Sequence, residues 1–277
     1  MIVWIDGELL DVAEARISPL DRGLTVGDGV FETLRVYGGI PFAWGRHSAR
    51  LAHSAAGLGL ALPDPDVLRA AAGAVLTANG LEEARLRVTV TGGEGPPGSS
   101  RAGAIPSAFI VAVPFEHGPA TTRAAIAPWT RNERSATAGL KTISYAANVR
   151  ALAYAEAYGA DEALFANTSG NLCEATGSNV FVVVDGVALT PPASAGCLLG
   201  VTRGLLLELA GSCGVEAREA DLPMTALSSV SEAFLTSTTR EVQAIGMIDD
   251  RELEAPGPVA ACLAAAFREL VARDLDP

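Results

Sequence analysis

Lys141 is the only lysine in this chain of 277 residues, because nineteen of its twenty Lys and Arg residues are arginine. Arginine keeps its proton in proteins, whereas a lysine amine can lose its proton and act as a nucleophile. The chemistry that needs such an amine is a Schiff base to a carbonyl, above all to pyridoxal phosphate. The alternative is compositional drift in a chain rich in Ala, Gly, Leu, Val and Arg. The count alone does not separate the two explanations.

Glu174 supplies the second group that this chemistry requires. It lies in the run Asn171-Leu172-Cys173-Glu174-Ala175-Thr176-Gly177-Ser178-Asn179. An acidic partner keeps a pyridine ring protonated, and the protonated ring acts as an electron sink. Taken alone, Glu174 is better explained as an exposed turn carboxylate.

Three further segments have the residue types of an anion site. Gly200-Val201-Thr202-Arg203 places a glycine turn before a helix, where free N–H groups and a hydroxyl can meet a phosphate. Thr236-Ser237-Thr238-Thr239-Arg240 follows a predicted strand with consecutive hydroxyls and amides. Arg46 and Arg50 fall on one face of a predicted helix. Each segment also has an ordinary reading, as a capped helix, a polar turn and a solvated arginine face.

Composition excludes several classes of function. The net charge of −12 argues against general affinity for nucleic acid or an anionic membrane. The N-terminus has no signal-peptide pattern, and no apolar run is long enough to span a bilayer. The four cysteines fit no zinc pattern and indicate reduced thiols in a cytoplasmic protein. The three histidines are too scattered to indicate a metal site, so we expect no metal.

The first half of the chain predicts an α+β domain over residues 1–115. Strands are expected at 2–5, 30–37, 85–91 and 108–114, and the strict alternation of residues 85–91 indicates one apolar face. Helices are expected at 44–58 and from Asp64-Pro65 to Asn79-Gly80, where an N-cap, a first-turn proline and a terminal glycine mark the ends.

The second half predicts a separate, larger domain over residues 139–277 that would hold the cofactor. Residues 116–138 are polar and irregular, with one short strand at 124–127, and are interpreted as the interdomain connection. Helices are expected at about 145–158, 202–212 and 258–271. Strands are expected near 162–166, 179–184, 216–218, 232–235 and 242–245.

The order and spacing of these motifs resemble the class IV, or fold type IV, pyridoxal-phosphate family. This family holds branched-chain and D-amino acid aminotransferases, (R)-amine transaminases and 4-amino-4-deoxychorismate lyase. The resemblance covers nearly the whole chain. It rests on these segments: 21–23, 27–32, 47–51, 54–55, Lys141 with Asn148, 160–164, 174–181, 190–192, 200–203 and 236–242.

The resemblance implies a two-domain α+β and α/β fold like that of D-amino acid aminotransferase, with the smaller domain first. Lys141 resembles the catalytic Schiff-base lysine that also shuttles a proton. Arg50 resembles the phosphate-binding arginine, and Glu174 the partner of the pyridine nitrogen. The remaining cofactor contacts implied are ring packing by Leu198 and phosphate contacts by Val201, Thr202 and Thr238. Family members are usually homodimers.

The substrate is less well defined by the sequence. Arg87 resembles in position a carboxylate-binding arginine of branched-chain enzymes, and Phe31, Arg35 and Thr239 are candidates for the pocket. The loop 91–100 lacks the Arg-x-His pair of well-known D-amino acid aminotransferases, since only Arg101 is near. We expect a transaminase that moves an amino group between a small-molecule amino donor, an amino acid with D-amino acids and (R)-amines as candidates, and a 2-oxo acid. The alternatives are an aminodeoxychorismate lyase and, from another class, a non-catalytic cofactor carrier, which the presence of both Lys141 and Glu174 disfavours.

Overall fold

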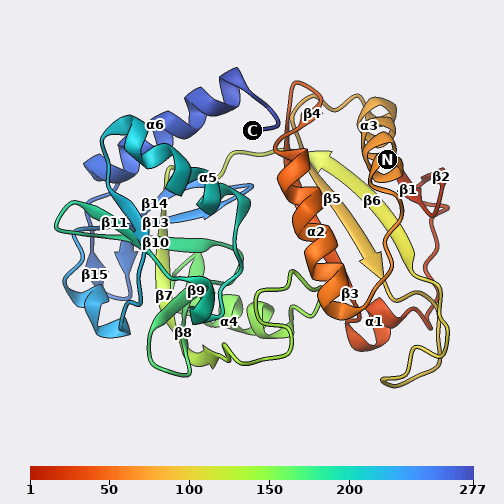
Figure 1. Ribbon diagram of the computed structural model, residues 1–277, viewed down its shortest axis with the longest axis horizontal. Helices are drawn as coiled ribbons and strands as arrows, with labels where there is room; N and C mark the ends of the chain where they lie inside the picture. The colour runs from red at the N-terminus through yellow and green to blue at the C-terminus, as the bar shows by residue number, and fades with distance from the viewer. The chain divides into compact units, whose positions relative to one another are not determined.

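The computed structural model describes residues 1–277, which form two compact units (Figure 1). The first unit consists of Met1–Glu116, Leu140–Tyr145 and Asp274–Pro277. The second consists of His117–Gly139 and Ala146–Arg273. This division differs from the expected boundaries, because the lysine-bearing segment and the C-terminal residues belong to the first unit.

The first unit is built on an antiparallel sheet of six strands in the order β2-β1-β6-β5-β3-β4. In chain order these strands are β1 (Ile2–Ile5), β2 (Glu8–Asp11), β3 (Gly29–Tyr37), β4 (Ile40–Pro41), β5 (Ala84–Thr91) and β6 (Ser107–Pro114). The short helix α1 (Arg22–Val26) precedes β3, and α2 (Trp44–Leu58) and α3 (Pro65–Asn79) pack on the sheet. The expected strands and helices of this half are thus present.

Alternation along β3 and β5 determines which side chains meet the helices. Val30, Leu34 and Val36 on β3 share one buried cluster with Leu86 and Val88 on β5. The same cluster contains apolar residues of α2 and α3, which bury the apolar face of the sheet. Glu32 has the same even-numbered phase as these apolar residues, so β3 directs one carboxylate toward the helices.

Specific contacts and a glycine determine where α2 begins and ends. The C-terminal residues of the chain return to its first turn, where the N–H of Gly45 donates to Asp276 Oδ1 at 2.7 Å and the N–H of Ala43 donates to the Leu275 carbonyl at 2.7 Å. A carboxylate at a helix N-terminus is stabilised by the helix dipole. The helix ends at Gly59, whose left-handed backbone (φ 66°) suits a residue without Cβ.

The second unit contains a mixed sheet of nine strands in the order β12-β11-β10-β13-β14-β7-β8-β9, with β15 paired to β14. The strands are β7 (Thr121–Arg131), β8 (Glu162–Asn167), β9 (Leu172–Ala175), β10 (Asn179–Val184), β11 (Val187–Thr190), β12 (Ala217–Glu219), β13 (Glu232–Ser237), β14 (Glu241–Ile248) and β15 (Arg251–Glu252). Helix α4 (Ala146–Ala157) packs on β7 and β8, and both α5 (Val201–Leu209) and α6 (Pro258–Arg273) pack on β13. Three 3₁₀ helices, η1 (Ala193–Ala195), η2 (Ala210–Cys213) and η3 (Met224–Ser228), lie in the connections.

The sequence predicted that residues 116–138 are mainly an irregular connection, and this prediction was wrong. They contain β7, an eleven-residue strand that lies between β14 and β8 and is parallel to both. The signal is weak because the buried residues of β7 are mostly alanines and threonine. Ala125 and Ala127 pack against alanines of α4, and small side chains carry little hydrophobic patterning.

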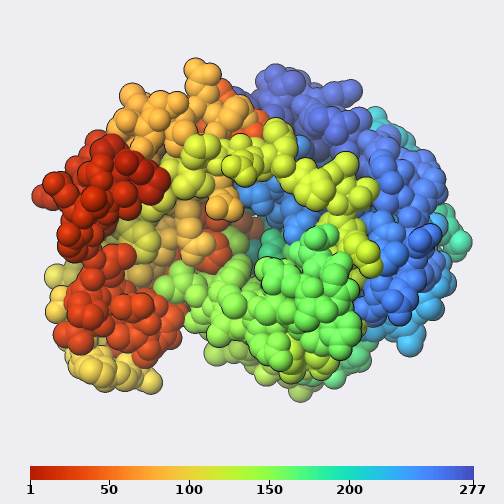
Figure 2. All heavy atoms as spheres, turned by 180° about the vertical axis from the view of Figure 1, so that it is seen from behind, coloured from red at the N-terminus to blue at the C-terminus, as the bar shows by residue number.

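Several large apolar side chains of the first unit are exposed, including Leu24 at 71% and Ile105 at 83%. Figure 2 shows the N-terminal segment, in red, on the surface of that unit. None of the helices of either unit is long and apolar enough to cross a membrane.

Candidate active site

Main-chain hydrogen bonds hold Lys141 against strand β3. The N–H of Phe31 donates to the Lys141 carbonyl at 3.1 Å, and the N–H of Ile143 donates to the Gly29 carbonyl at 3.0 Å. The N–H of Lys141 itself donates to Ser54 Oγ of α2 at 3.0 Å, and Ser54 is fully buried. This pairing with β3 is the reason that the lysine belongs to the first unit.

The side chain of Lys141 lies beside an aromatic ring that a second cation also contacts. Its Nζ is 4.3 Å from the centroid of the Phe31 ring, and the guanidinium carbon of Arg87 is 3.7 Å from the same centroid. The ring of Tyr145 meets Phe31 edge-on at 5.3 Å. The Nε of Arg87 donates to Thr89 Oγ1 at 3.1 Å, which orients the guanidinium along β5. The predicted residues Lys141, Phe31 and Arg87 are therefore neighbours.

Arg50, the predicted phosphate contact, is bound to a buried carboxylate. Its Nε and Nη2 donate to Glu32 Oε1 and Oε2, each at 2.7 Å, and His47 Nδ1 lies 2.7 Å from Oε2. Glu32 and His47 are buried, and the Arg50 side chain is 12% exposed. The sequence alone indicated no role for Glu32 or His47. One signal was present in the sequence, because Glu32 alternates with apolar residues on the buried face of a predicted strand. A carboxylate buried in this way requires a cationic or hydrogen-bonding partner.

In the second unit, Glu174 on β9 is oriented by two partners. Its Oε2 accepts the N–H of Leu198 at 2.9 Å, and its Oε1 lies 3.4 Å from Arg131 Nε. Arg131 Nη2 donates in turn to Asn148 Oδ1 at 3.0 Å. These contacts bring together two predicted cofactor residues, Glu174 and Leu198, and place the carboxylate beside the guanidinium of Arg131.

Asn179, at the start of β10, links the remaining predicted residues of the second unit. Its Nδ2 donates to the Leu198 carbonyl at 2.6 Å, and its backbone is paired with Thr236 of β13. A Cβ at Gly200 would clash with its Oδ1, so the chain needs glycine where it turns into α5. The first residues of that helix, Val201 and Thr202, are both buried. The sequence alone indicated no role for Asn179, because the contact of its side chain with Leu198 depends on the fold.

The donor groups near Asn179 suit an anion. The hydroxyls of Ser178 and Thr236 are buried without a hydrogen-bond partner. The strand β13 runs to Ser237, two residues farther than predicted, so that only Thr238 to Arg240 form the turn. Thr238 and Thr239 are half-buried in this turn. Unsatisfied buried hydroxyls and the N-terminus of α5 are groups that a phosphate can satisfy.

Arg35 does not have the environment of a pocket residue, contrary to the prediction. It is one of the largest fully buried side chains, and its guanidinium pairs with Glu83 and donates to the Val36 carbonyl at 2.7 Å. Its guanidinium carbon lies 3.5 Å from the Phe115 ring centroid and 4.6 Å from that of Tyr37. Arg35 therefore stabilises the sheet.

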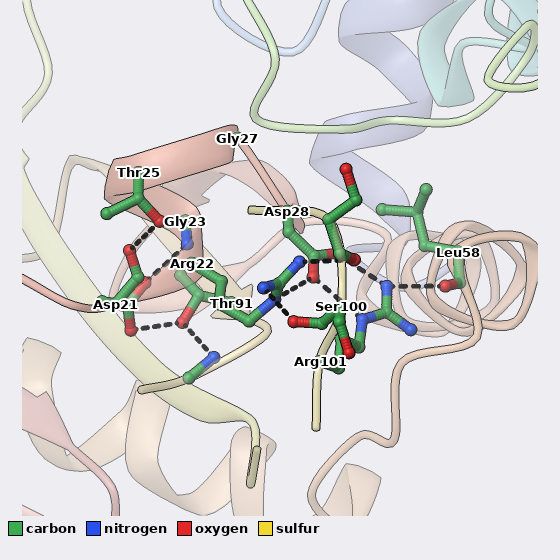
Figure 3. A network of polar contacts seen from close by, with 12 residues as sticks. Asp21, Arg22, Gly23, Thr25, Gly27, Asp28, Leu58, Thr91, Ser100 and Arg101 are labelled. Carbon is green, nitrogen blue, oxygen red and sulfur yellow. Dashed lines mark hydrogen bonds and ion pairs between the residues drawn. The ribbon is translucent and has the colours of Figure 1, made fainter. Parts of the chain in front are cut away.

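The motifs Asp21-Arg22-Gly23 and Gly27-Asp28-Gly29 organise the loop after β5 (Figure 3). Arg22 is buried and donates to Asp28 at 2.9 Å and to the carbonyl of Ser100 at 2.7 Å. Arg101 pairs with the same Asp28 at 2.7 Å and donates to the Leu58 carbonyl at the end of α2. The Arg101 hydrogen bonds hold the pKa of Asp28 below its ordinary value. Arg101 is thus engaged in holding the loop.

One unit carries the single lysine, and the other carries an oriented glutamate and turns whose donor groups suit an anion, which are residue types that pyridoxal-phosphate enzymes use. The family model for amino-transferase class IV matches residues 29–248, and the chain belongs to this family. The chain is 32% identical to the branched-chain-amino-acid aminotransferase of Pseudomonas aeruginosa, over 98% of this chain and 92% of that protein. It is 31% identical to the D-alanine aminotransferase of Listeria innocua, over 99% and 97% respectively.

Solved structures agree with this assignment. The branched-chain aminotransferase from Thermoproteus uzoniensis with norvaline superposes with a TM-score of 0.92 at 32% identity, covering 98% of this chain and 94% of that one. The T.th. branched-chain amino acid aminotransferase with pyridoxamine 5′-phosphate has a TM-score of 0.91 at 28% identity, covering 98% and 93%. The predicted family, the fold class and the class of enzyme, a pyridoxal-phosphate-dependent aminotransferase of class IV, are confirmed.

Proposed function

We propose that this protein moves an amino group between an amino acid and a 2-oxo acid, with Lys141 as the amine that binds pyridoxal phosphate covalently. One observation carries the proposal. The single lysine of the chain lies beside Phe31, and the same ring contacts Arg87, a cation suited to a substrate carboxylate.

The side chains present fit the cofactor. Arg50, Val201, Thr202 and Thr238 would hold its phosphate, and Leu198 would pack against its ring. The unsatisfied hydroxyls of Ser178 and Thr236 support an anion in the second unit. Glu174, oriented by Leu198 and Arg131, would hold a proton on the pyridine nitrogen. When bound, pyridoxal phosphate supplies an aldehyde carbon for the amine and a protonated ring that withdraws electrons.

The residues of the first unit would carry out the proton transfer. Lys141 Nζ, as a free amine, would take up the proton of the substrate α-carbon and would deliver it to the former aldehyde carbon of the cofactor, on the other side of the amino nitrogen. The Phe31 ring lies against Nζ, and Tyr145 packs edge-on against that ring. Arg87 would bind the α-carboxylate, with Thr239 as a second contact, and so hold the α-carbon in place.

The first test replaces the lysine. We expect Lys141→Ala to abolish transamination and the yellow, borohydride-bleachable absorbance of the bound cofactor, because no other lysine can replace it. An amine-directed label should react only with the N-terminus in the loaded wild-type protein and should modify Lys141 after the cofactor is removed. A colourless wild-type protein that stays inactive with added cofactor would contradict the proposal.

A second assay separates the transaminase from aminodeoxychorismate lyase, the other candidate. The protein is incubated with 2-oxoglutarate and, in separate tubes, D-alanine, L-leucine or (R)-1-phenylethylamine. We expect glutamate in at least one tube, and its chirality reports the stereochemistry. Release of pyruvate and p-aminobenzoate from aminodeoxychorismate, without glutamate in the other tubes, would identify a lyase.

We also propose that the protein works as a cytoplasmic homodimer on small-molecule substrates. The four cysteines are all free thiols, which supports a reducing compartment. Exposed apolar side chains such as Leu24 and Ile105 support a subunit contact on the first unit. Analytical ultracentrifugation of the wild type and of Leu24→Glu tests the dimer.

A further inference from the structure

We propose that Glu32 is a positioning residue that fixes the guanidinium of Arg50 for the phosphate of the cofactor. This inference rests on the proposed function, because Arg50 is a phosphate contact only if pyridoxal phosphate binds. Glu32 does not itself meet the cofactor in this proposal, and it acts through Arg50.

The geometry that supports this role is a two-point contact. Glu32 binds the Nε–Nη2 edge of Arg50 with both carboxylate oxygens at 2.7 Å. A guanidinium is planar, so a contact through two donors fixes the orientation of the whole group and not only its position.

The position of Glu32 is itself rigid. Its side chain is 1% exposed, and it extends from the middle of β3 toward α2, on the apolar phase of the strand. His47 and Arg50 are three residues apart on α2, which places both on the side of the helix that faces Glu32. The carboxylate therefore joins the sheet and the helix at the point where Arg50 leaves the helix.

The charges agree with the proposed role. Burial alone would raise the pKa of Glu32, but the charge of Arg50 and the hydrogen bonds from Arg50 and His47 outweigh burial and hold this pKa at about 2. Burial lowers the pKa of His47. A neutral His47 donates its Nδ1 proton to Glu32, so the carboxylate is fixed by a third donor without a second positive charge.

The consequence concerns the cofactor phosphate alone. A free arginine side chain samples many rotamers and must be ordered when an anion binds. An arginine that a buried carboxylate already holds in place loses little conformational entropy when the phosphate binds. This smaller entropy cost compensates for the weaker attraction between the phosphate and an arginine whose charge Glu32 partly neutralises. Loss of Glu32 should therefore weaken the binding of a phosphorylated cofactor more than that of the same ring without phosphate.

The experiment compares pyridoxal phosphate with pyridoxal. Apoprotein is titrated with each aldehyde, and Kd is taken from the visible absorbance of the lysine-bound form. In Glu32→Gln we expect Kd for pyridoxal phosphate to rise about tenfold or more, and Kd for pyridoxal to change by less than about threefold. Glutamine has the shape of glutamate, but its N–H₂ group replaces one of the two acceptor oxygens. That N–H₂ group then faces a donor of Arg50 or His47, and the hydrogen bond at that position is lost.

Two controls separate positioning from general destabilisation. Glu232→Gln removes another buried carboxylate, which accepts the N–H of Ala260 at 3.1 Å, and should leave both constants within about twofold of wild type. His47→Leu keeps the Glu32–Arg50 pair and removes only the third donor. We expect it to fold and to show a smaller, still phosphate-selective loss of about threefold.

A double substitution tests whether Glu32 acts through Arg50. In an Arg50→Ala background, adding Glu32→Gln should cause no further loss of pyridoxal phosphate binding, because the buried carboxylate then only repels the phosphate. An equal loss for both aldehydes, no loss for either, or additive losses in the double variant would overturn the inference. If wild type binds neither aldehyde, the proposed function fails first. If wild type binds both aldehydes and Glu32→Gln leaves the ratio of the two Kd values unchanged, the inference is overturned and the proposed function stands.

Discussion

At the scale of single residues, the types of side chain identified the chemistry, and contacts decided which of them take part. Lys141 is distinctive in the sequence because it is alone. Arg35 and Arg87 lie on the same face of the sheet, on the neighbouring strands β3 and β5, and the sequence alone does not distinguish their roles. Contacts separate them, since Arg35 is closed in by Glu83 and Phe115, whereas Arg87 lies on the ring that Lys141 also contacts.

Arg87 carries the clearest residue-scale prediction. In Arg87→Gln, KM for a donor amino acid should rise about tenfold or more, because a charge-assisted contact to its carboxylate is lost. An (R)-amine donor has no carboxylate, and its KM should change little. Steady-state kinetics with both donors make the comparison. Equal losses for the two donors would show that Arg87 only supports Phe31.

At the scale of elements, the sequence predicted those with strong local signals. The helices α2 and α3 have amphipathic patterns and terminal glycines, and α3 also begins with a capping aspartate, Asp64, and a proline. The strand β7 lacks such signals, because its buried side chains are small and its role depends on partners far away in sequence. The length of β13 was underestimated for the same reason, since its last residues pair with the start of β14.

The turn into α5 gives an element-scale prediction with a matched control. Gly200→Ala places a methyl against the side-chain oxygen of Asn179, so it should displace the helix start and weaken pyridoxal phosphate binding about tenfold or more. Gly204→Ala adds the same methyl within α5, where nothing lies within 4 Å. It should stabilise the helix by about 1 kcal/mol and leave cofactor affinity unchanged. Thermal unfolding and cofactor titration measure both effects, and equal behaviour of the two variants would contradict the predicted role of Asn179.

At the scale of the whole molecule, the buried Glu32–His47–Arg50 group predicts how stability depends on pH. The folded-state pKa of Glu32, about 2, lies below its ordinary value of 4.5, so the unfolded chain takes up this proton first as the pH falls. The stability from Glu32 is therefore complete above about pH 4.5 and is lost toward pH 2. The lowered pKa of His47 acts in the same direction, with its loss beginning below its ordinary value of 6.5.

Unfolding in urea at several pH values tests this prediction. In a Trp129→Phe background, the buried Trp4 and Trp44 report on the first unit alone. Between pH 5 and pH 3 its free energy of unfolding should fall less in Glu32→Gln than in the parent, by roughly 1 to 3 kcal/mol. Parallel pH profiles would show that Glu32 titrates in the folded protein as it does in the unfolded chain.

The sequence by itself determined the class of chemistry and most of the helices and strands, because residue type and local periodicity carry both. Only the tertiary structure decided that Lys141 belongs with the first unit, that Arg35 is structural, and that Glu32, His47 and Asn179 orient predicted site residues. These features depend on hydrogen bonds between segments that are distant in sequence, such as Lys141 with Ser54 and Asn179 with Leu198. A side chain's partners across the fold determine whether it is a ligand or a support, and no local pattern of residues contains that information.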